Sequence, residues 1–399
     1  MENPKIRFKG FTKDWEQRKL GEVCSRVQGN DGRMNLPTLT ISAANGWMNQ
    51  EDRFSGNIAG KEQKNYTLLH KGELSYNHGN SKLAKYGTVF SLQSYKEALV
   101  PRVYHSFKVE EGSPDFLEYY FATKLPDREL GKLISSGARM DGLLNIGYNE
   151  FMGIQMLFPS VEEQKQISNY FRNLDTLITL HQRKCEQTKK LKKYMLQKMF
   201  PQNGAKVPEI RFYGFTYDWE QRKLIDYLEV SSEKNRDNRF TKEDVLSVSG
   251  EYGIVNQIEF QGRSFAGASV SNYGVVENGD VVYTKSPLKS NPYGIIKTNK
   301  GIPGIVSTLY AVYKPKEITD SKFVQIYFEL DSRMNSYMHP LVNKGAKNDM
   351  KVSAENALKG MVSFPKKDEQ EMISLYFSTI DHLITLHQRQ HKLHLNMLL

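Results

Sequence analysis

Residues 4–20 read PKIRFKGFTKDWEQRKL, and residues 208–224 read PEIRFYGFTYDWEQRKL. These stretches are identical at 14 of 17 positions, where residue usage alone predicts about one match. A second pair of stretches, residues 163–183 and 369–389, agrees at 14 of 21 positions, and each follows a Phe-Pro dipeptide. The chain is therefore an internal duplication whose copies begin with the first motif and end with the second.

The two copies differ in the sequence between these shared frames. Only short matches persist there: Tyr76 corresponds to Tyr283, and the Gly-Ala-Arg sequence at 137–139 corresponds to Gly-Ala-Lys at 345–347. Constant frames around variable interiors favour two copies of one scaffold that carry different binding surfaces. Drift after a simple gene duplication is the alternative, and it explains less well why the frames stayed nearly identical.

Each copy ends in a segment that predicts one long helix. No proline or glycine interrupts residues 160–200, and the later segment repeats the pattern in a shorter form. Both segments carry seam positions at alternating steps of four and three, the spacing of a coiled coil; they are Ile167, Phe171, Leu174, Ile178 and His181, and then Ile373, Phe377, Ile380, Ile384 and His387. We predict that the two helices form an antiparallel coiled coil with pseudo-twofold symmetry. The alternative is that each helix packs only against its own domain.

The interiors have the composition of two α+β domains. Strands are expected within residues 87–92, 101–109, 279–285 and 304–314, and one amphipathic helix is expected in each copy, at 114–124 and 320–334. The expected organisation is a first α+β domain at 1–158, a long helix at 159–200, a linker at 201–210, a second α+β domain at 211–364 and a second long helix at 365–399.

Composition excludes several classes of protein. The 399 residues carry a formal net charge of +10, and 39% of them are hydrophobic, which argues against general disorder and favours a polyanionic partner. Two cysteines, Cys24 and Cys185, are too few for a disulfide framework. No apolar run approaches the ~18 residues of a membrane span. The N-terminus also lacks a secretory signal, so we expect a cytoplasmic protein that does not contact a membrane.

Motifs that carry catalysis are absent from the sequence. We find no phosphate-binding GxxxxGK[ST], no dinucleotide-binding GxGxxG, and neither HExxH nor GxSxG. His387, His391 and His394 share one helical face, so a zinc site is an alternative to a polar seam there. We expect no catalytic residue and no metal in this chain; an unrecognised nuclease is the alternative.

Cations interleaved with Asn, Ser and Tyr occur at equivalent places in both interiors. Lys and Arg neutralise phosphates and Asn reads base edges, so these clusters favour DNA binding, although solvated loops have a similar composition. The candidate contacts are Asn77, Asn80, Lys82, Lys85 and Arg139 in the first copy, and Lys285, Lys289, Asn291, Lys344 and Lys347 in the second. The stretch from Arg183 to Lys198, with seven cations and one acid, either lines a DNA path or is a solvated helix face.

The two repeated motifs together resemble those of the specificity (S) subunit of type I restriction–modification systems, over essentially the whole chain. The resemblance implies two target recognition domains, each binding one half of a bipartite DNA sequence, and a coiled coil that sets the spacer between the halves. It also implies that the chain is non-catalytic and that its partners are double-stranded DNA, two modification subunits and two restriction subunits. S-adenosylmethionine, ATP and Mg2+ are then expected on those subunits. A stand-alone sequence-specific DNA-binding regulator is the alternative function.

Overall fold

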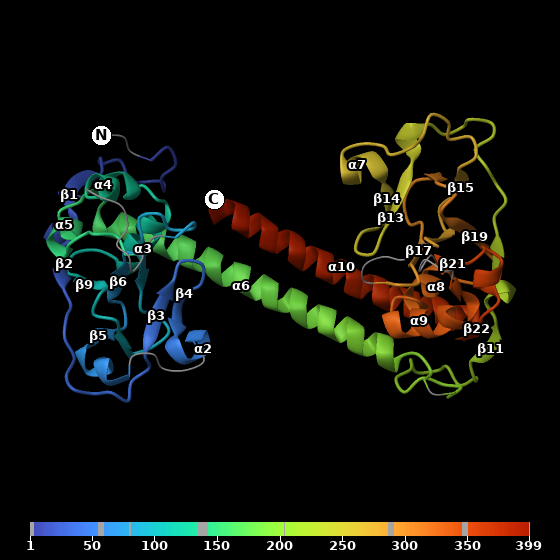
Figure 1. Cartoon of the computed structure of the whole chain (residues 1–399), viewed down its shortest axis with the longest axis horizontal. Helices are drawn as coiled ribbons and strands as arrows, with labels where there is room; N and C mark the ends of the chain where they lie inside the picture. The colour runs from blue at the N-terminus through green and yellow to red at the C-terminus, as the bar shows by residue number, and fades with distance from the viewer. Residues whose placement is uncertain are drawn as a thin grey trace. The chain divides into compact units, whose positions relative to one another are not determined.

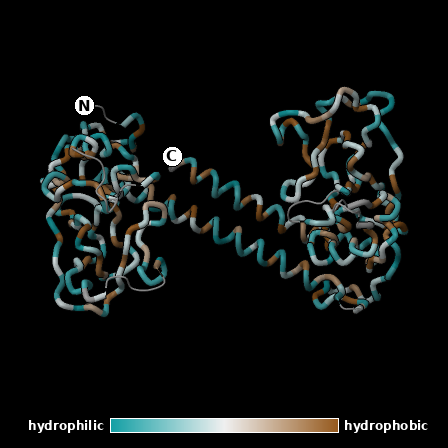
Figure 2. Tube along the Cα trace, viewed as in Figure 1, coloured by the Kyte–Doolittle hydropathy of each residue, from teal (hydrophilic) through white to brown (hydrophobic). Residues whose placement is uncertain are grey.

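The computed structural model of the chain describes residues 4–54, 60–79, 81–134, 143–202, 204–285, 291–344 and 350–398. The chain divides into two compact units (Figure 1), one made of residues 1–177 with 394–399 and the other of residues 178–393. Each unit mixes helices and strands around its own hydrophobic core, so the predicted α+β fold class is confirmed. Figure 2 shows short hydrophobic stretches alternating with hydrophilic ones along the chain in both units.

The first unit is built on a four-stranded antiparallel sheet with the order β2 (Cys24–Arg26), β9 (His105–Val109), β6 (Leu74–Asn77) and β7 (Thr88–Ser91). Leu74 and Tyr76 in the central strand β6 are fully buried. Three two-stranded sheets accompany it: β1 (Glu16–Lys19) with β10 (Gln155–Phe158), β3 (Leu39–Ser42) with β4 (Gly46–Asn49), and β5 (Thr67–His70) with β8 (Glu97–Val100). The shorter helices of this unit are α1 (Leu20–Val23), α2 (Gln50–Phe54), α3 (Pro114–Ala122), α4 (Asp127–Lys132) and α5 (Tyr148–Met152).

The second unit repeats this topology strand for strand. Its four-stranded sheet has the order β12 (Leu228–Val230), β19 (Ala311–Pro315), β16 (Val281–Tyr283) and β17 (Ile296–Thr298). Its matching pairs are β11 (Glu220–Lys223) with β22 (Met361–Phe364), β13 (Leu246–Ser249) with β14 (Gly253–Asn256), and β15 (Gly274–Val276) with β18 (Gly304–Val306). It also contains the pair β20 (Asn343–Lys344) and β21 (Met350–Lys351), and the helices α7 (Gln257–Gln261), α8 (Ser321–Tyr327) and α9 (Asp331–Met338).

Several elements are shorter than the sequence predicted, including the strand expected at 279–285, which covers only Val281–Tyr283. The strand expected at 101–109 covers only its second half, because Pro101 lacks an N–H for a ladder and begins a turn. The strand expected at 304–314 is divided into β18 and β19, which belong to different sheets. The helix expected at 320–334 is divided into α8 and α9, since the backbone at Leu330 is extended (ψ 114°). Apolar patterning persists across such breaks, which is why it did not reveal them.

The two long helices are α6 (Val161–Lys198) and α10 (Lys367–Leu398), with 38 and 32 residues. They pack together: the Nδ1 atoms of His181 and His387 are 3.2 Å apart, and Lys192 pairs with Asp381 at 2.6 Å. Positions further along α6 therefore meet earlier positions of α10, and the helices are antiparallel, as predicted.

The first turns of each long helix pack against the neighbouring α+β core. Ile373, Phe377 and Ile380 of α10 are almost fully buried in the core of the second unit, and Ile167 of α6 packs against the core of the first. Own-domain packing, the alternative weighed from the sequence, thus holds for the beginning of each helix, while His181 and His387 lie where the helices meet. One apolar stripe serves both purposes.

Candidate nucleic-acid interface

Two loops leave the four-stranded sheets at equivalent positions and carry many of the predicted DNA contacts. The first joins β6 to β7 and the second joins β16 to β17. The hydroxyl of Tyr76 donates to the carbonyl of Tyr86 (2.7 Å), and that of Tyr283 donates to the carbonyl of Tyr293 (2.8 Å). Burial raises the pKa of both Tyr76 and Tyr283, which keeps each hydroxyl protonated as a donor. Each loop is thus closed at its base by the same hydrogen bond.

In the first loop the predicted contacts have different surroundings. The Asn77 amide is used within the fold, because Nδ2 donates to the carbonyl of Ile41 (3.3 Å) and Oδ1 accepts from the N–H of Gly79 (3.1 Å). Lys82 and Lys85 are exposed. The side chains of these two lysines are therefore available to a phosphate, while the Asn77 amide already has partners within the fold. Asn80 lies outside the described residues.

In the second loop the predicted contacts are partly engaged. The Lys285 ammonium donates to the carbonyl of Thr308 (3.1 Å), and burial together with nearby Lys234 lowers its pKa. The Asn291 amide donates to the carboxylate of Asp331 (2.6 Å).

The remaining candidate contacts lie outside these two loops or outside the described residues. The main chain of Lys344 pairs with Met350 in β20 and β21. Arg139, Lys289 and Lys347 lie outside the described residues.

The repeated motifs are joined by an ion pair that the sequence did not reveal. Arg7 Nε and Nη2 donate to the two carboxylate oxygens of Glu163 at 2.9 and 2.7 Å. Arg211 binds Glu369 in the same way at 2.8 and 2.7 Å. Both carboxylates are buried, so each ion pair fixes the first motif of a copy to the start of its long helix. Both copies carry the arginine in the first motif and the glutamate in the second. This shared occurrence is the feature of the sequence from which the ion pair could have been predicted.

The glutamine after each of these glutamates has a second, equally duplicated role. Gln164 donates to the carbonyl of Pro159 (3.1 Å) and accepts from the N–H of Ser113 (3.0 Å). Gln370 likewise donates to Pro365 (2.9 Å) and accepts from Asp320 (3.0 Å). The side-chain oxygen of each glutamine therefore accepts from the N–H of the residue that immediately precedes α3 or α8. The Phe-Pro and Glu-Gln motifs are explained by this arrangement.

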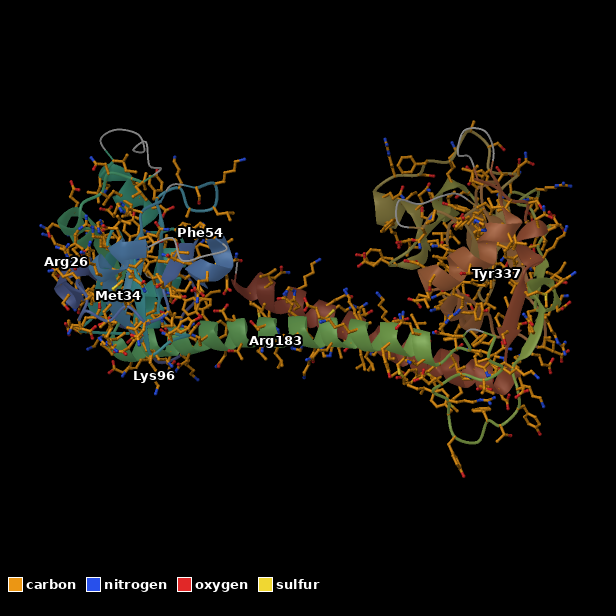
Figure 3. All side chains as sticks on the ribbon, turned by 60° about the horizontal axis from the view of Figure 1, so that its bottom comes forward. Arg26, Met34, Phe54, Lys96, Arg183 and Tyr337 are labelled. Carbon is orange, nitrogen blue, oxygen red and sulfur yellow. The ribbon has the colours of Figure 1, made fainter. Side chains whose placement is uncertain are left out.

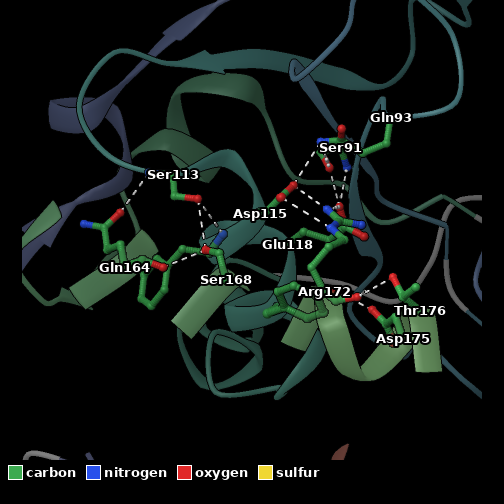
Figure 4. Close-up of polar contacts among 12 residues, drawn as sticks. Ser91, Gln93, Ser113, Asp115, Glu118, Gln164, Ser168, Arg172, Asp175 and Thr176 are labelled. Carbon is green, nitrogen blue, oxygen red and sulfur yellow. Dashed lines mark hydrogen bonds and ion pairs between the residues drawn. The ribbon is translucent and has the colours of Figure 1, made fainter. Parts of the chain in front are cut away.

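Figure 4 shows how α3 is held against α6 in the first unit. The Oγ atoms of Ser113 and Ser168 are 3.0 Å apart, and Arg172 forms an ion pair with Asp115. Glu118, next to this pair, accepts a hydrogen bond from the N–H of Ser91 (3.1 Å). The edge strand β7, the helix α3 and the long helix are thus connected through side chains.

A solved structure shares this fold. The type I restriction–modification S subunit from M. genitalium aligns over 100% of this chain and 97% of its own, with a TM-score of 0.57 and 13% identity. The chain described here therefore has the fold of a type I S subunit. The HsdS subunit from Thermoanaerobacter tengcongensis aligns over 97% of this chain and 96% of its own, with a TM-score of 0.46 and 14% identity. A chain from a study of type I system assembly aligns over 97% and 95%, with a TM-score of 0.43 and 14% identity. No protein-family model and no curated protein matches the sequence.

On this S-subunit fold, the basic end of α6 is largely exposed. Two of its seven cations are engaged in ion pairs: Lys192 with Glu329 and Asp381, and Lys198 with Glu209. The other five are exposed, namely Arg183 (Figure 3), Lys184, Lys189, Lys190 and Lys193. An exposed row of cations of this kind can neutralise phosphates.

Metal binding, the reactivity of Cys24 and the presence of membrane-spanning helices are three further points on which the structure bears. Among the parts of the chain that the structure describes, no group of three or more His, Cys, Asp or Glu side chains is arranged to hold a metal ion. Burial raises the pKa of Cys24 to about 12, so its thiolate is not populated near neutral pH. Within the described ranges, no helix is both long enough and apolar enough to cross a membrane.

Proposed function

We propose that this chain is the DNA-recognition subunit of a type I restriction–modification complex. It reads a bipartite DNA target and directs adenine methylation and restriction by partner subunits. The observation that carries this proposal is the pair of loops on one duplicated scaffold, closed by the same Tyr hydrogen bond and different in sequence. Recognition of two different half-sites requires two loops that are held in the same way and differ in sequence.

In this proposal the phosphate contacts of the first unit come from Lys82 and Lys85. Those of the second unit come from Lys285, Lys289 and Lys347. The net charge of +10 supports such binding, and each recognised base pair adds about 1–3 kcal/mol of discrimination. In this proposal the antiparallel helices α6 and α10 keep the two target recognition domains a fixed distance apart. Linking two modest readers at a fixed distance multiplies their selectivity.

The proposed partners follow from the frames. Glu16, Gln17 and Lys19 on β1 are exposed, and the identical residues on β11 are exposed as well. Solvent-exposed positions tolerate substitution, so folding alone does not explain their identity in both copies. A surface present twice suits two copies of one partner, here the modification subunits. S-adenosylmethionine, ATP and Mg2+ would be bound by the modification and restriction subunits.

Methylation mapping tests this function. The genome of cells with the chain should contain methylated adenines in a two-part motif, and the motif should disappear when the gene is deleted. The chain should also co-purify with a methyltransferase. Tight specific DNA binding without a methylated motif would support the stand-alone regulator instead, and metal-dependent cleavage by the isolated chain would support a nuclease.

A further inference from the structure

One position of the duplicated sheet differs in chemical character between the units. In the first unit Phe90 on β7 lies opposite Ser75 on β6, and its ring packs beneath the β3–β4 hairpin, 3.4 Å from where a methyl group at Gly46 would lie. In the second unit the equivalent residue on β17 is Lys297, opposite Val282 on β16. A lysine thus replaces an aromatic residue that fills the space under the hairpin.

Lys297 is buried without a direct partner. Only 8% of it is exposed, and among the described residues its ammonium forms no hydrogen bond or ion pair. The nearest carboxylates, on Glu329 and Asp381, both pair with Lys192 instead. Burial lowers the pKa of Lys297, although the carboxylates of Glu329 and Asp381 act in the opposite direction. A buried ammonium without a counter-ion is unfavourable unless an anion accompanies it.

The lysine lines a cavity of about 360 Å3 where the β13–β14 turn faces α6 and α10. Lys189, Lys192 and Lys300 also line it, and its carboxylates are Glu251, Glu329 and Asp381. The four lysines therefore outnumber the three carboxylates by one positive charge. The cavity therefore carries excess positive charge, and its volume is that of a small-molecule site.

The remaining lining is suited to an organic group. Tyr252 stands at the cavity and is 62% exposed, and the side chains of Ile254 and Ile384 add apolar surface. The Oε2 atom of Glu329 is buried and accepts no hydrogen bond from the described residues. An aromatic ring, apolar walls and a spare acceptor can bind a base and a hydroxyl or amine, while the lysines bind a phosphate.

We propose that this cavity of the second unit binds a small phosphate ester of the nucleotide class, with Lys297 and Lys300 at the phosphate. A backbone phosphate of duplex DNA is joined to a nucleotide on each side and cannot enter a small cavity. A terminal phosphate on a small molecule can. This site is separate from the loops that carry the proposed DNA recognition and does not depend on them.

Calorimetric titration of the full chain with AMP, and separately with inorganic phosphate, tests the proposal at constant ionic strength. We expect AMP to bind, phosphate to bind more weakly and to compete with AMP, and Lys297→Phe to weaken AMP binding at least tenfold. Lys297→Phe places the residue of the first unit at this position. Lys322→Met, an exposed lysine on α8 outside the cavity, removes the same charge and should leave AMP affinity unchanged.

Circular dichroism establishes that Lys297→Phe is folded; if it is not, Lys300→Gln replaces it and should weaken AMP binding at least threefold. Failure of the wild-type chain to bind either AMP or phosphate at millimolar concentration would overturn the proposal. Equal AMP affinity of the cavity variant and the wild type would do the same. If the variant loses affinity for duplex DNA but the wild type binds no AMP, the lysine serves DNA, and the small-molecule site is wrong. Retained duplex binding with lost AMP binding supports the site independently of the proposed function.

Discussion

Arg7 and Glu163 are 156 residues apart in the chain and form a two-pronged ion pair, with a shortest distance of 2.7 Å. Arg211 and Glu369 repeat it at the same shortest distance. The pair joins the first strand region of each copy to the beginning of its long helix. It gives a physical reason for the presence of both motifs in both copies, because the buried carboxylate of each pair is neutralised by the arginine.

Replacing Glu163 by Gln should lower the thermal midpoint of the chain by several degrees. The change leaves the Arg7 guanidinium facing a neutral amide in a site where the carboxylate side chain is only 2% exposed. Calorimetry of the variant measures the shift. The exposed pair of Lys132 and Glu129 provides the control, since Lys132→Met should change the midpoint little. Equal shifts for the two variants would show that the motif pair contributes no more than a surface pair.

Replacing Arg333 by Met should destabilise the second unit by about 2–3 kcal/mol. The Arg333 guanidinium stacks 4.3 Å from the ring centroid of Phe200 and donates to the carbonyls of Leu196 (2.9 Å) and Tyr327 (2.8 Å). Its loss removes this donor from the Leu196 carbonyl at the C-terminal end of α6 and from the Tyr327 carbonyl at the C-terminal end of α8, where a cation is favourable.

Urea unfolding of Arg333→Met checks this value. Arg263 is the matched control, because it stacks on Phe265 at 4.6 Å on the surface. Arg263→Met should cost less than about 1 kcal/mol. A result in which both arginine variants have the wild-type free energy of unfolding would contradict the role assigned to Arg333.

Glu118→Gln should raise stability near pH 7, because burial raises the pKa of Glu118 and makes its charged form costly. The equivalent residue of the second unit is Gln325, which accepts from the N–H of Thr298 at 3.0 Å. Since the folded-state pKa is raised, the wild type takes up a proton more readily when folded. It therefore gains stability relative to the variant as pH falls through that pKa.

Unfolding of wild type and Glu118→Gln from pH 7 to pH 4 measures this difference. A difference that stays constant with pH, or that widens on acidification, would show that the carboxylate of Glu118 is not the group responsible.

Several features of the fold were predictable from the sequence. The features that were not predictable were missed for physical reasons. The duplication, the α+β class and the two long helices were predicted, because identity and periodicity are local properties of a sequence. The pairing of Arg7 with Glu163 was not, since nothing local links residues so distant. Asn77 and Asn291 were predicted to contact DNA, but their amides also hydrogen-bond within the fold. Composition identifies which groups can bind and does not show which are already engaged.

Lys82→Gln combined with Lys85→Gln should weaken duplex binding and reduce the slope of log affinity against log salt by about 2, since each phosphate contact contributes about 0.9. Fluorescence anisotropy at several salt concentrations measures the slope. Lys96, labelled in Figure 3, is exposed in a different turn, and Lys96→Gln should leave the slope unchanged. An unchanged slope in the double variant would remove these lysines from the interface.

We propose that the two target recognition domains bind DNA at a fixed distance from one another. An insertion of four residues in α6, within 186–190, tests this distance most directly. Four helical residues add about 6 Å along the helix axis. Methylation mapping in cells that carry the altered chain should then show the same two half-sites separated by one or two more base pairs. Altered half-sites with an unchanged gap would contradict the account.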